Sequence, residues 1–202
     1  MCGRYLIAME EEIVEMREII REITRLYAGR PELPMMKKGE IFPTDMVPVI
    51  ALEGGKPEPH LFTWGFPHWL GSGVIINARS ETAGEKKMFS QALKERRCII
   101  PSSGFYEWHH REGKKHKDKY LLRQSQNAVL YMAGLYTVYQ QEGINRPVFV
   151  ILTTGAHESV RVIHNRMPVI VKRDEQEKWL QDEDFAHHVL KREGPFLEMI
   201  RQ

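Results

Sequence analysis

A cysteine stands second in the chain, directly after Met1. Methionine before a small residue is commonly removed, and its removal would make Cys2 the mature N-terminus. The α-amine and the thiol then have reference pKa values of about 7.7–8.0 and about 8.5, so both react near neutral pH. Such an aminothiol can condense with an aldehyde and close a thiazolidine ring. Two other interpretations of Cys2 stay open. It could be an N-terminal nucleophile that hydrolyses an amide, or a cysteine that stands second by chance.

A polar run, Asn77-Ala78-Arg79-Ser80-Glu81-Thr82, follows a predicted strand over residues 74–76. Polar side chains at the end of a strand are well placed for binding or catalysis. The guanidinium of Arg79 can hold a phosphate, and the amide of Asn77 can both donate and accept hydrogen bonds. The structural alternative is a turn in which Ser80 or Thr82 caps the next helix.

Two further segments carry groups that can move protons. In Gly104-Phe105-Tyr106-Glu107-Trp108, strand alternation turns Glu107 to the face opposite its aromatic neighbours, where it can act as a general acid. His164 lies between a short helix and a strand, where it can donate a hydrogen bond or shuttle a proton. The alternatives are an exposed glutamate and a surface histidine. His109, His110, His187 and His188 are interpreted as surface histidines.

These segments need a scaffold, and the apolar pattern predicts mostly strands. Apolar residues at three- and four-residue steps predict one helix over residues 13–27. Gly54-Gly55 is typical of a tight hairpin turn. Further short helices are expected over 86–94, 157–163 and 174–181, and strands over 47–52, 61–64, 74–76, 98–100, 105–108, 120–122, 129–138, 148–153 and 167–171. We predict one α+β domain over residues 1–202, built on a mostly antiparallel, barrel-like sheet with flanking helices.

Composition excludes several classes of protein. The 202 residues are 42% hydrophobic and 28% charged, which is typical of a globular protein. With 29 Lys+Arg against 27 Asp+Glu, the net charge of +2 does not by itself indicate nucleic-acid binding. Two distant cysteines, Cys2 and Cys98, form neither a zinc motif nor a disulfide scaffold. We therefore expect a cytoplasmic protein without metal, cofactor, signal peptide or membrane span.

Several stretches, taken together, closely resemble the SRAP (SOS response-associated peptidase) family. The stretches are residues 1–5, 64–66, 77–82, 101–108, 151–154 and 164–170. Each is weak alone, but their order across most of the chain is highly specific. The resemblance implies the SRAP fold and a monomer that handles abasic sites in single-stranded DNA. The ring-opened sugar of such a site carries an aldehyde at C1′, which is the electrophile that an N-terminal aminothiol captures.

The resemblance also implies roles for individual residues. Cys2 would supply amine and thiol, Glu107 would transfer protons, and Asn77 would orient the amine and the sugar. His164 would hydrogen-bond the sugar O4′ as it becomes a hydroxyl. DNA contacts are implied for Arg4 and Arg79 on phosphates, for Pro43 and Trp69 against the bases that flank the lesion, and for Thr154.

Two exits from one Schiff base are expected. A plain Schiff base at C1′ acidifies the C2′ proton and favours β-elimination, which breaks the strand. Capture by the thiol removes the iminium and gives a thiazolidine that shields the lesion. The family name also records a peptidase activity, which in this chain would trim the protein's own N-terminus.

The chain departs from the family pattern in two places. The family usually shows Asn-x-Ala-Pro-Thr, whereas this chain has Glu40-Ile41-Phe42-Pro43-Thr44. The tail after Gly194 is short and lacks the usual polar strand, so an edge of the sheet or of the DNA groove is expected to differ. Two other functions compete with abasic-site capture: a cysteine peptidase that uses Cys2 with His164 as base, and a non-catalytic single-strand binding module.

Overall fold

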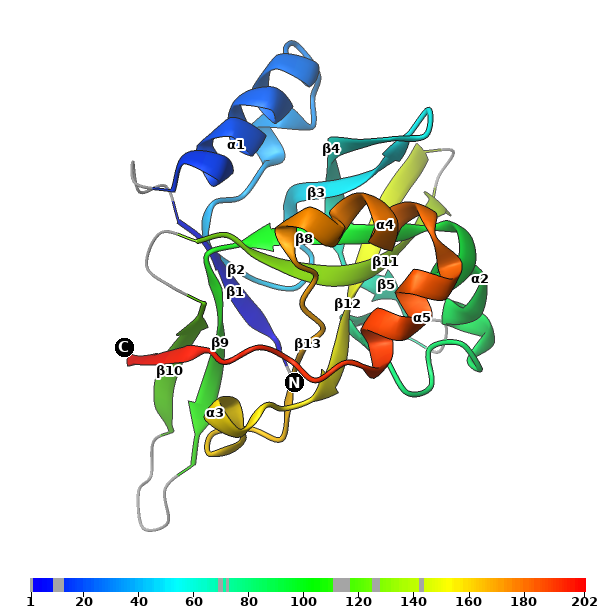
Figure 1. Ribbon diagram of the computed structural model, residues 1–202. Helices are drawn as coiled ribbons and strands as arrows, with labels where there is room; N and C mark the ends of the chain where they lie inside the picture. The colour runs from blue at the N-terminus through cyan, green and yellow to red at the C-terminus, as the bar shows by residue number, and fades with distance from the viewer. Residues whose placement is uncertain are drawn as a thin grey trace.

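The computed structural model describes residues 2–8, 13–68, 71, 73–110, 117–124, 128–141 and 144–202. Strands dominate it, and helices lie at its periphery (Figure 1). The helices are α1 (Val14–Leu26), α2 (Lys87–Glu95), α3 (Glu158–Arg161), α4 (Gln176–Gln181) and α5 (Glu183–Lys191), with short 3-10 turns η1 (Leu33–Met35) and η2 (Arg173–Glu175). The strands are β1 (Arg4–Ile7), β2 (Gly39–Ile41), β3 (Met46–Glu53), β4 (Lys56–Trp64), β5 (Phe66–Pro67), β6 (Val74–Ile75), β7 (Asn77–Arg79), β8 (Arg97–Ser102), β9 (Gly104–His109), β10 (Asp118–Arg123), β11 (Leu130–Gln141), β12 (Ile144–Gly155), β13 (Arg166–Pro168) and β14 (Glu198–Arg201).

The larger sheet closes on itself. Strands β11, β8, β3, β4 and β12 pair in that order, and β11 also pairs with β12 along its length. β7 and β13 add to β12, and β12 runs parallel to β4 and to β7, whereas the other pairings of this sheet are antiparallel. The mostly antiparallel, barrel-like α+β fold is therefore confirmed.

A second sheet places the start of the chain beside the Glu107 strand. Its strand order is β14-β10-β9-β1-β2. Arg4 pairs with Tyr106 between β1 and β9, and Tyr120 pairs with Glu107 between β10 and β9. Because side chains alternate along each strand, Tyr5, Phe105 and Glu107 share one face of this sheet.

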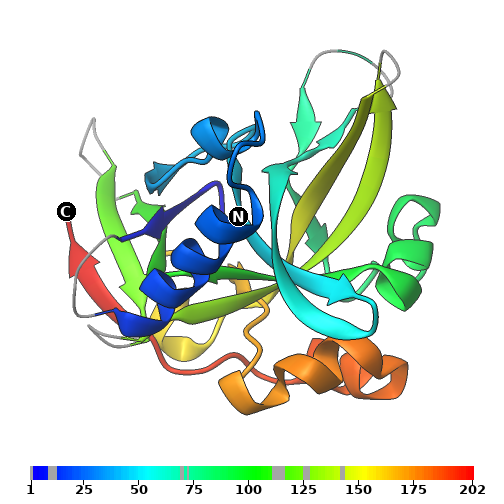
Figure 2. The same ribbon diagram turned by 90° about the horizontal axis from the view of Figure 1, so that it is seen from above.

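Helices cover the barrel from several sides (Figure 2). Helix α1 packs its buried residues Met16, Ile20 and Ile23 toward β3 and β4, as its apolar stripe predicts. Helix α4 contacts β8, β3 and β4, and its fully buried Trp179 donates from Nε1 to the carbonyl of Cys98 at 3.0 Å. None of the helices in the described ranges combines the length and apolar character that a bilayer crossing needs.

Most of the predicted elements are confirmed, and the tight turn at Gly54 and Gly55 has φ values of 57° and 82°, as a hairpin of this kind requires. Several predictions are wrong in detail. Asn77–Arg79 is itself a strand, and α2 begins only at Lys87 after the N-cap Lys86, so neither Ser80 nor Thr82 caps it. The last predicted strand ends at Pro168. The tail forms β14, which pairs with β10, and α5 had not been predicted.

Candidate active site

Cys2 is fully buried at the entrance to β1, beside a residue far along the chain. The amide nitrogen Nδ2 of Asn77 donates to the carbonyl oxygen of Cys2 at 2.9 Å, across 75 residues of sequence. The carbonyl oxygen Oδ1 of Asn77 is buried and accepts no hydrogen bond within the described part of the chain. An amine at Cys2 would therefore have a hydrogen-bond acceptor close to it, as the orienting role predicted for Asn77 requires.

The indole of Trp64 holds the segment that carries Asn77. Its Nε1 donates to the carbonyl of Ile76 at 3.0 Å, and that carbonyl also accepts from the backbone of Ile151 at 3.0 Å. The same ring meets Tyr5 of β1 edge-on, with centroids 5.2 Å apart. Trp64 thus contacts both the strand that follows Cys2 and the segment that precedes Asn77.

Glu107 is buried, with 4% of its surface exposed, so the alternative of an exposed glutamate is wrong. Gly104 opens its strand with φ of 149°, and a Cβ at this position would lie 2.7 Å from the carbonyl oxygen of Leu122. Only glycine allows β9 to approach β10 this closely, and the pairing that follows along these strands places Glu107 opposite Tyr120.

The surroundings of Cys2 favour a protonated thiol. Burial raises the pKa of the Cys2 thiol far above its ordinary value, and the negative charge of the nearby Glu107 raises it further. The structure therefore brings Cys2, Asn77 and Glu107 into one place, as expected.

His164 is half-buried just ahead of β13. The backbone N–H of Arg166 donates to its Nδ1 at 3.0 Å. The same Nδ1 lies 3.2 Å from the carbonyl oxygen of Arg166, so the backbone of Arg166 holds this edge of the ring. The hydrogen-bond donation expected of His164 stays a prediction.

Two of the predicted DNA contacts, Arg79 and Thr154, lie beside or on β12. Arg79 is exposed on β7 opposite Thr153, and the half-buried Thr154 pairs with Met167 of β13. Arg166 was missed by sequence reasoning: its Nη2 donates to the carbonyl of Thr153 at 2.6 Å and to Glu81 at 2.9 Å. The sequence signal for the pair of Glu81 and Arg166 was their opposite charges, one in the stretch 77–82 and the other in the stretch 164–170.

The other predicted contacts lie near β1 and β2. Arg4 projects from β1 and forms an ion pair with Glu40 at 3.0 Å. Pro43 is half-buried in a loop that the backbone of Trp64 pins, since Thr44 donates to the Trp64 carbonyl at 2.8 Å. Trp69 lies outside the described residues.

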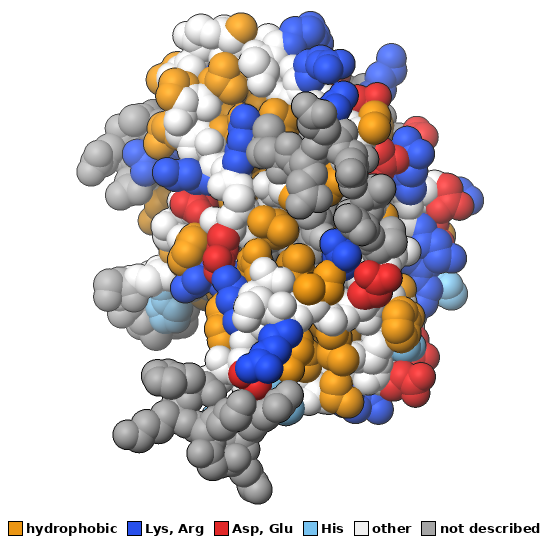
Figure 3. Space-filling model, turned by 90° about the vertical axis from the view of Figure 1, so that its left-hand side faces the viewer, with side chains coloured by type: hydrophobic (Ala, Val, Ile, Leu, Met, Phe, Trp, Pro, Cys, Tyr) orange, Lys and Arg blue, Asp and Glu red, His pale blue; other side chains and the backbone are white. Residues whose placement is uncertain are grey.

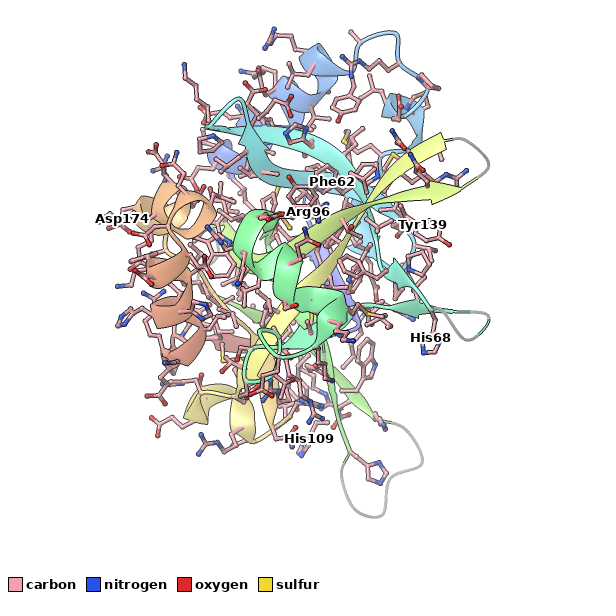
Figure 4. All side chains as sticks on the ribbon, turned by 90° about the vertical axis from the view of Figure 1, so that its right-hand side faces the viewer. Phe62, His68, Arg96, His109, Tyr139 and Asp174 are labelled. Carbon is pink, nitrogen blue, oxygen red and sulfur yellow. The ribbon has the colours of Figure 1, made fainter. Side chains whose placement is uncertain are left out.

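Other polar features lie away from Cys2. A cavity of about 840 Å³ is lined by residues that include Glu15, Tyr131, Arg173 and Arg192. Figure 4 shows His68 and His109 at the outer ends of their strands, and His110, His187 and His188 are exposed. Within the described ranges, no cluster of three His, Cys, Asp or Glu side chains has a geometry that could hold a metal ion.

Solved structures share this fold. A protein from Bacteroides thetaiotaomicron superposes with a TM-score of 0.79 at 23% identity, covering 99% of this chain and 91% of its own. A protein from Bordetella bronchiseptica gives a TM-score of 0.74 at 22% identity, over 100% of this chain and 99% of its own. At these identities the likeness concerns the fold, an α+β barrel with an attached sheet.

Sequence comparison assigns the family. The family model "SOS response associated peptidase (SRAP)" matches residues 1–198. The abasic site processing protein YoqW of Bacillus subtilis is 31% identical over 94% of this chain and 86% of its own. YoaM of the same organism, which bears the same description, is 30% identical over 89% of this chain and 79% of its own. The chain belongs to the SRAP family, which confirms the resemblance.

Proposed function

We propose that this protein processes abasic sites in single-stranded DNA by forming a thiazolidine cross-link through Cys2 after removal of Met1. The observation that carries the proposal is the hydrogen bond of 2.9 Å from Asn77 to Cys2, which joins two motifs of the sequence at one buried place. The names of the Bacillus relatives support the substrate class. The chemistry of an aminothiol beside a carboxylate supports the reaction.

The reaction follows from the groups present. The free amine of Cys2 attacks the C1′ aldehyde, and Glu107 supplies and removes the protons as the carbinolamine loses water to give an iminium. The Cys2 thiol then adds to the same carbon, and its proton passes to a base. The product contains one new C–N and one new C–S bond, and one water molecule leaves. His164 donates a hydrogen bond to O4′ as the sugar ring opens.

The raised pKa of the Cys2 thiol gives Glu107 a second task. A thiolate next to a buried carboxylate would place two negative charges in a site of low polarity, which is unfavourable. Transfer of the thiol proton to Glu107, concerted with C–S bond formation, avoids that state. Ring closure then competes with β-elimination, so shielding and lyase activity are two exits from the iminium.

The peptidase alternative has less support in the geometry. A cysteine peptidase needs a histidine that accepts the thiol proton. The Cys2 thiol instead donates to the carbonyl of Arg4 at 3.7 Å, and Nδ1 of His164 is engaged by the backbone of Arg166. We therefore propose that any peptidase activity is limited to self-processing, and that the protein acts as a monomer in the cytoplasm, at the nucleoid, without metal or cofactor.

An oligonucleotide with one abasic site tests the proposal on a denaturing gel. We expect an adduct whose mass equals the protein without Met1 plus the DNA minus one water. Cys2→Ala should abolish the adduct, whereas Cys98→Ala should retain it, because Cys98 is buried in β8. An adduct that persists in Cys2→Ala, or a wild-type protein that carries no free Cys2 amine and still forms the adduct, would contradict the proposal.

A further inference from the structure

A cluster of charged and aromatic side chains lies on the second sheet, on the face opposite Glu107. Pairing between strands places Arg4 beside Tyr106 and Lys119 beside Trp108, and Leu6 beside Glu40. Residues that pair directly point to the same face of a sheet. We call Arg4, Glu40, Tyr106, Trp108 and Lys119 the Glu40 cluster.

Glu40 holds two cations at once. Its Oε1 accepts from Nη1 of Arg4 at 3.0 Å, and its Oε2 accepts from Nζ of Lys119 at 2.7 Å. Burial would raise the pKa of Glu40, but the hydrogen bonds from Lys119 and Arg4 outweigh burial and hold the pKa below its ordinary value. The carboxylate is therefore ionised at neutral pH, and both of its oxygens are engaged.

Aromatic rings also contact the two cations. The guanidinium of Arg4 lies 3.8 Å from the ring centroid of Phe42, and Nζ of Lys119 lies 3.9 Å from that of Tyr106. The ring centroid of Trp108 lies 5.7 Å from Arg4 and 5.8 Å from Lys119. Such contacts fix the positions of cations. The aromatic rings thus add to Glu40 in holding the two cations at this place.

The cluster is accessible from solvent. The side chains of Arg4, Glu40 and Lys119 are 35%, 29% and 27% exposed. Figure 3 shows the side of the molecule on which β1, β9 and β10 lie, where basic, acidic and apolar side chains are intermixed. Two cations with one carboxylate leave one positive charge uncompensated, and the cluster begins two residues from Cys2.

We propose that Arg4 and Lys119 form a subsite for a phosphate of single-stranded DNA, and that Glu40 occupies this subsite in the free protein. A phosphodiester presents one negative charge and two free oxygens, which match the two cations as the carboxylate does. This inference rests on the proposed function, because it assigns the backbone of the same DNA. It adds Lys119 to the DNA contacts and makes Glu40 an internal competitor of the phosphate.

Displacement of Glu40 has measurable consequences. A DNA phosphate can bind here only after the ion pairs of Glu40 with Arg4 and Lys119 break. The loss of these ion pairs offsets part of the free energy of phosphate binding. The free protein also binds fewer counterions at this place than two unpaired cations would. Affinity for DNA and its dependence on salt are therefore both lower than the two cations alone would give.

The variant Glu40→Gln tests this in the full-length protein, with an undamaged single-stranded oligonucleotide and equilibrium binding. We expect affinity to rise by about threefold at low salt, the order expected from the loss of partly exposed ion pairs. The plot of log affinity against log salt should become steeper by about 0.7, because one more cation releases a counterion. Glu198→Gln is the matched control, since Glu198 pairs with Arg123 on the same sheet, and it should change neither quantity.

A double-mutant cycle with Lys119→Gln locates the effect. The gain from Glu40→Gln should shrink in the Lys119→Gln background, because one of the two cations is then absent. A full gain in that background, or an unchanged affinity and salt slope in Glu40→Gln, would overturn the subsite while cross-linking of abasic DNA still supported the proposed function. A wild-type protein that neither binds single-stranded DNA nor cross-links abasic DNA would overturn both the subsite and the proposed function. Thermal unfolding of each variant separates these results from loss of the fold.

Discussion

The Nε1 of Trp64 lies 3.0 Å from the carbonyl oxygen of Ile76, the residue that directly precedes Asn77. This hydrogen bond makes a fully buried tryptophan the support of the segment that holds Cys2. The ring also contacts Tyr5, so the indole bridges the two parts of the site. Trp64 acts through Asn77 and Tyr5, and its effect on chemistry should therefore be separable from its effect on stability.

Replacing Trp64 by Phe should slow cross-linking more than it lowers affinity for undamaged DNA. Phe keeps an aromatic ring but cannot donate to Ile76, and loss of this bond and of part of the ring should cost about 2–4 kcal/mol of stability. Cross-linking rate at saturating abasic DNA, measured well below the melting temperature, gives the effect on chemistry.

Trp179→Phe is the control for Trp64→Phe. Trp179 is equally buried and donates from the same atom to a backbone carbonyl, that of Cys98 at 3.0 Å, but it lies on α4. We expect a similar loss of stability with an unchanged cross-linking rate. Equal slowing by both variants would show that Trp64 supports the fold in general rather than Asn77.

Replacing Glu107 by Gln distinguishes two roles of this carboxylate. Gln keeps the shape but cannot accept a proton, so we expect cross-linking to slow by about 100-fold or more, in the range of general acid–base catalysis. Affinity for undamaged single-stranded DNA should stay within about twofold, because Glu107 lies on the face opposite Arg4. Rapid-quench cross-linking and equilibrium binding give the two quantities.

The opposite result for Glu107→Gln has its own meaning. The charge of Glu107 raises the pKa of the Cys2 thiol, so its removal lowers that pKa. If suppression of the thiolate were the whole role of Glu107, the variant would cross-link faster than the wild type. Equal losses of rate and affinity would instead assign Glu107 to the structure of the DNA site.

Local sequence patterns predicted much of this fold, and their failures have a common cause. The stripe of α1 and the apolar runs of β3, β8 and β12 are read from neighbouring residues. Asn77 instead enters a strand because it pairs with Ile151 in parallel, and no local pattern shows such a partner. β1 was missed for the same reason, since its four residues are defined by β2 and β9.

The same distinction applies to the candidate site, where residue types and motifs were predictable but contacts between distant residues were not. Cys2, Asn77 and Glu107 were singled out by residue type and motif, and the structure brings them together. The ion pair between Glu40 and Lys119 was not expected, because 79 residues separate them. The charged run over residues 114–119 is typical of a solvated hairpin tip, with a phosphate contact as the alternative. Residues 111–116 lie outside the described ranges, whereas Lys119 is half-buried in β10.

Stability should fall at alkaline pH through the buried thiols, and Cys98→Ala should reduce this fall. Burial raises the pKa of the Cys98 thiol well above its ordinary value. A group whose pKa is raised in the folded state contributes stability that is fully present below its unfolded pKa, about 8.5, and is lost as pH rises toward the folded value. Each such thiol therefore lowers the free energy of unfolding by about 1.4 kcal/mol per pH unit above that point.

Urea unfolding from pH 7 to pH 10.5 measures the slope of the free energy of unfolding against pH. The slope for Cys98→Ala should be less steep than that of the wild type by about this amount, even though the stability of the variant at pH 7 is lower. Parallel curves for the two proteins would show that the Cys98 thiol ionises in the folded state as it does in the unfolded chain.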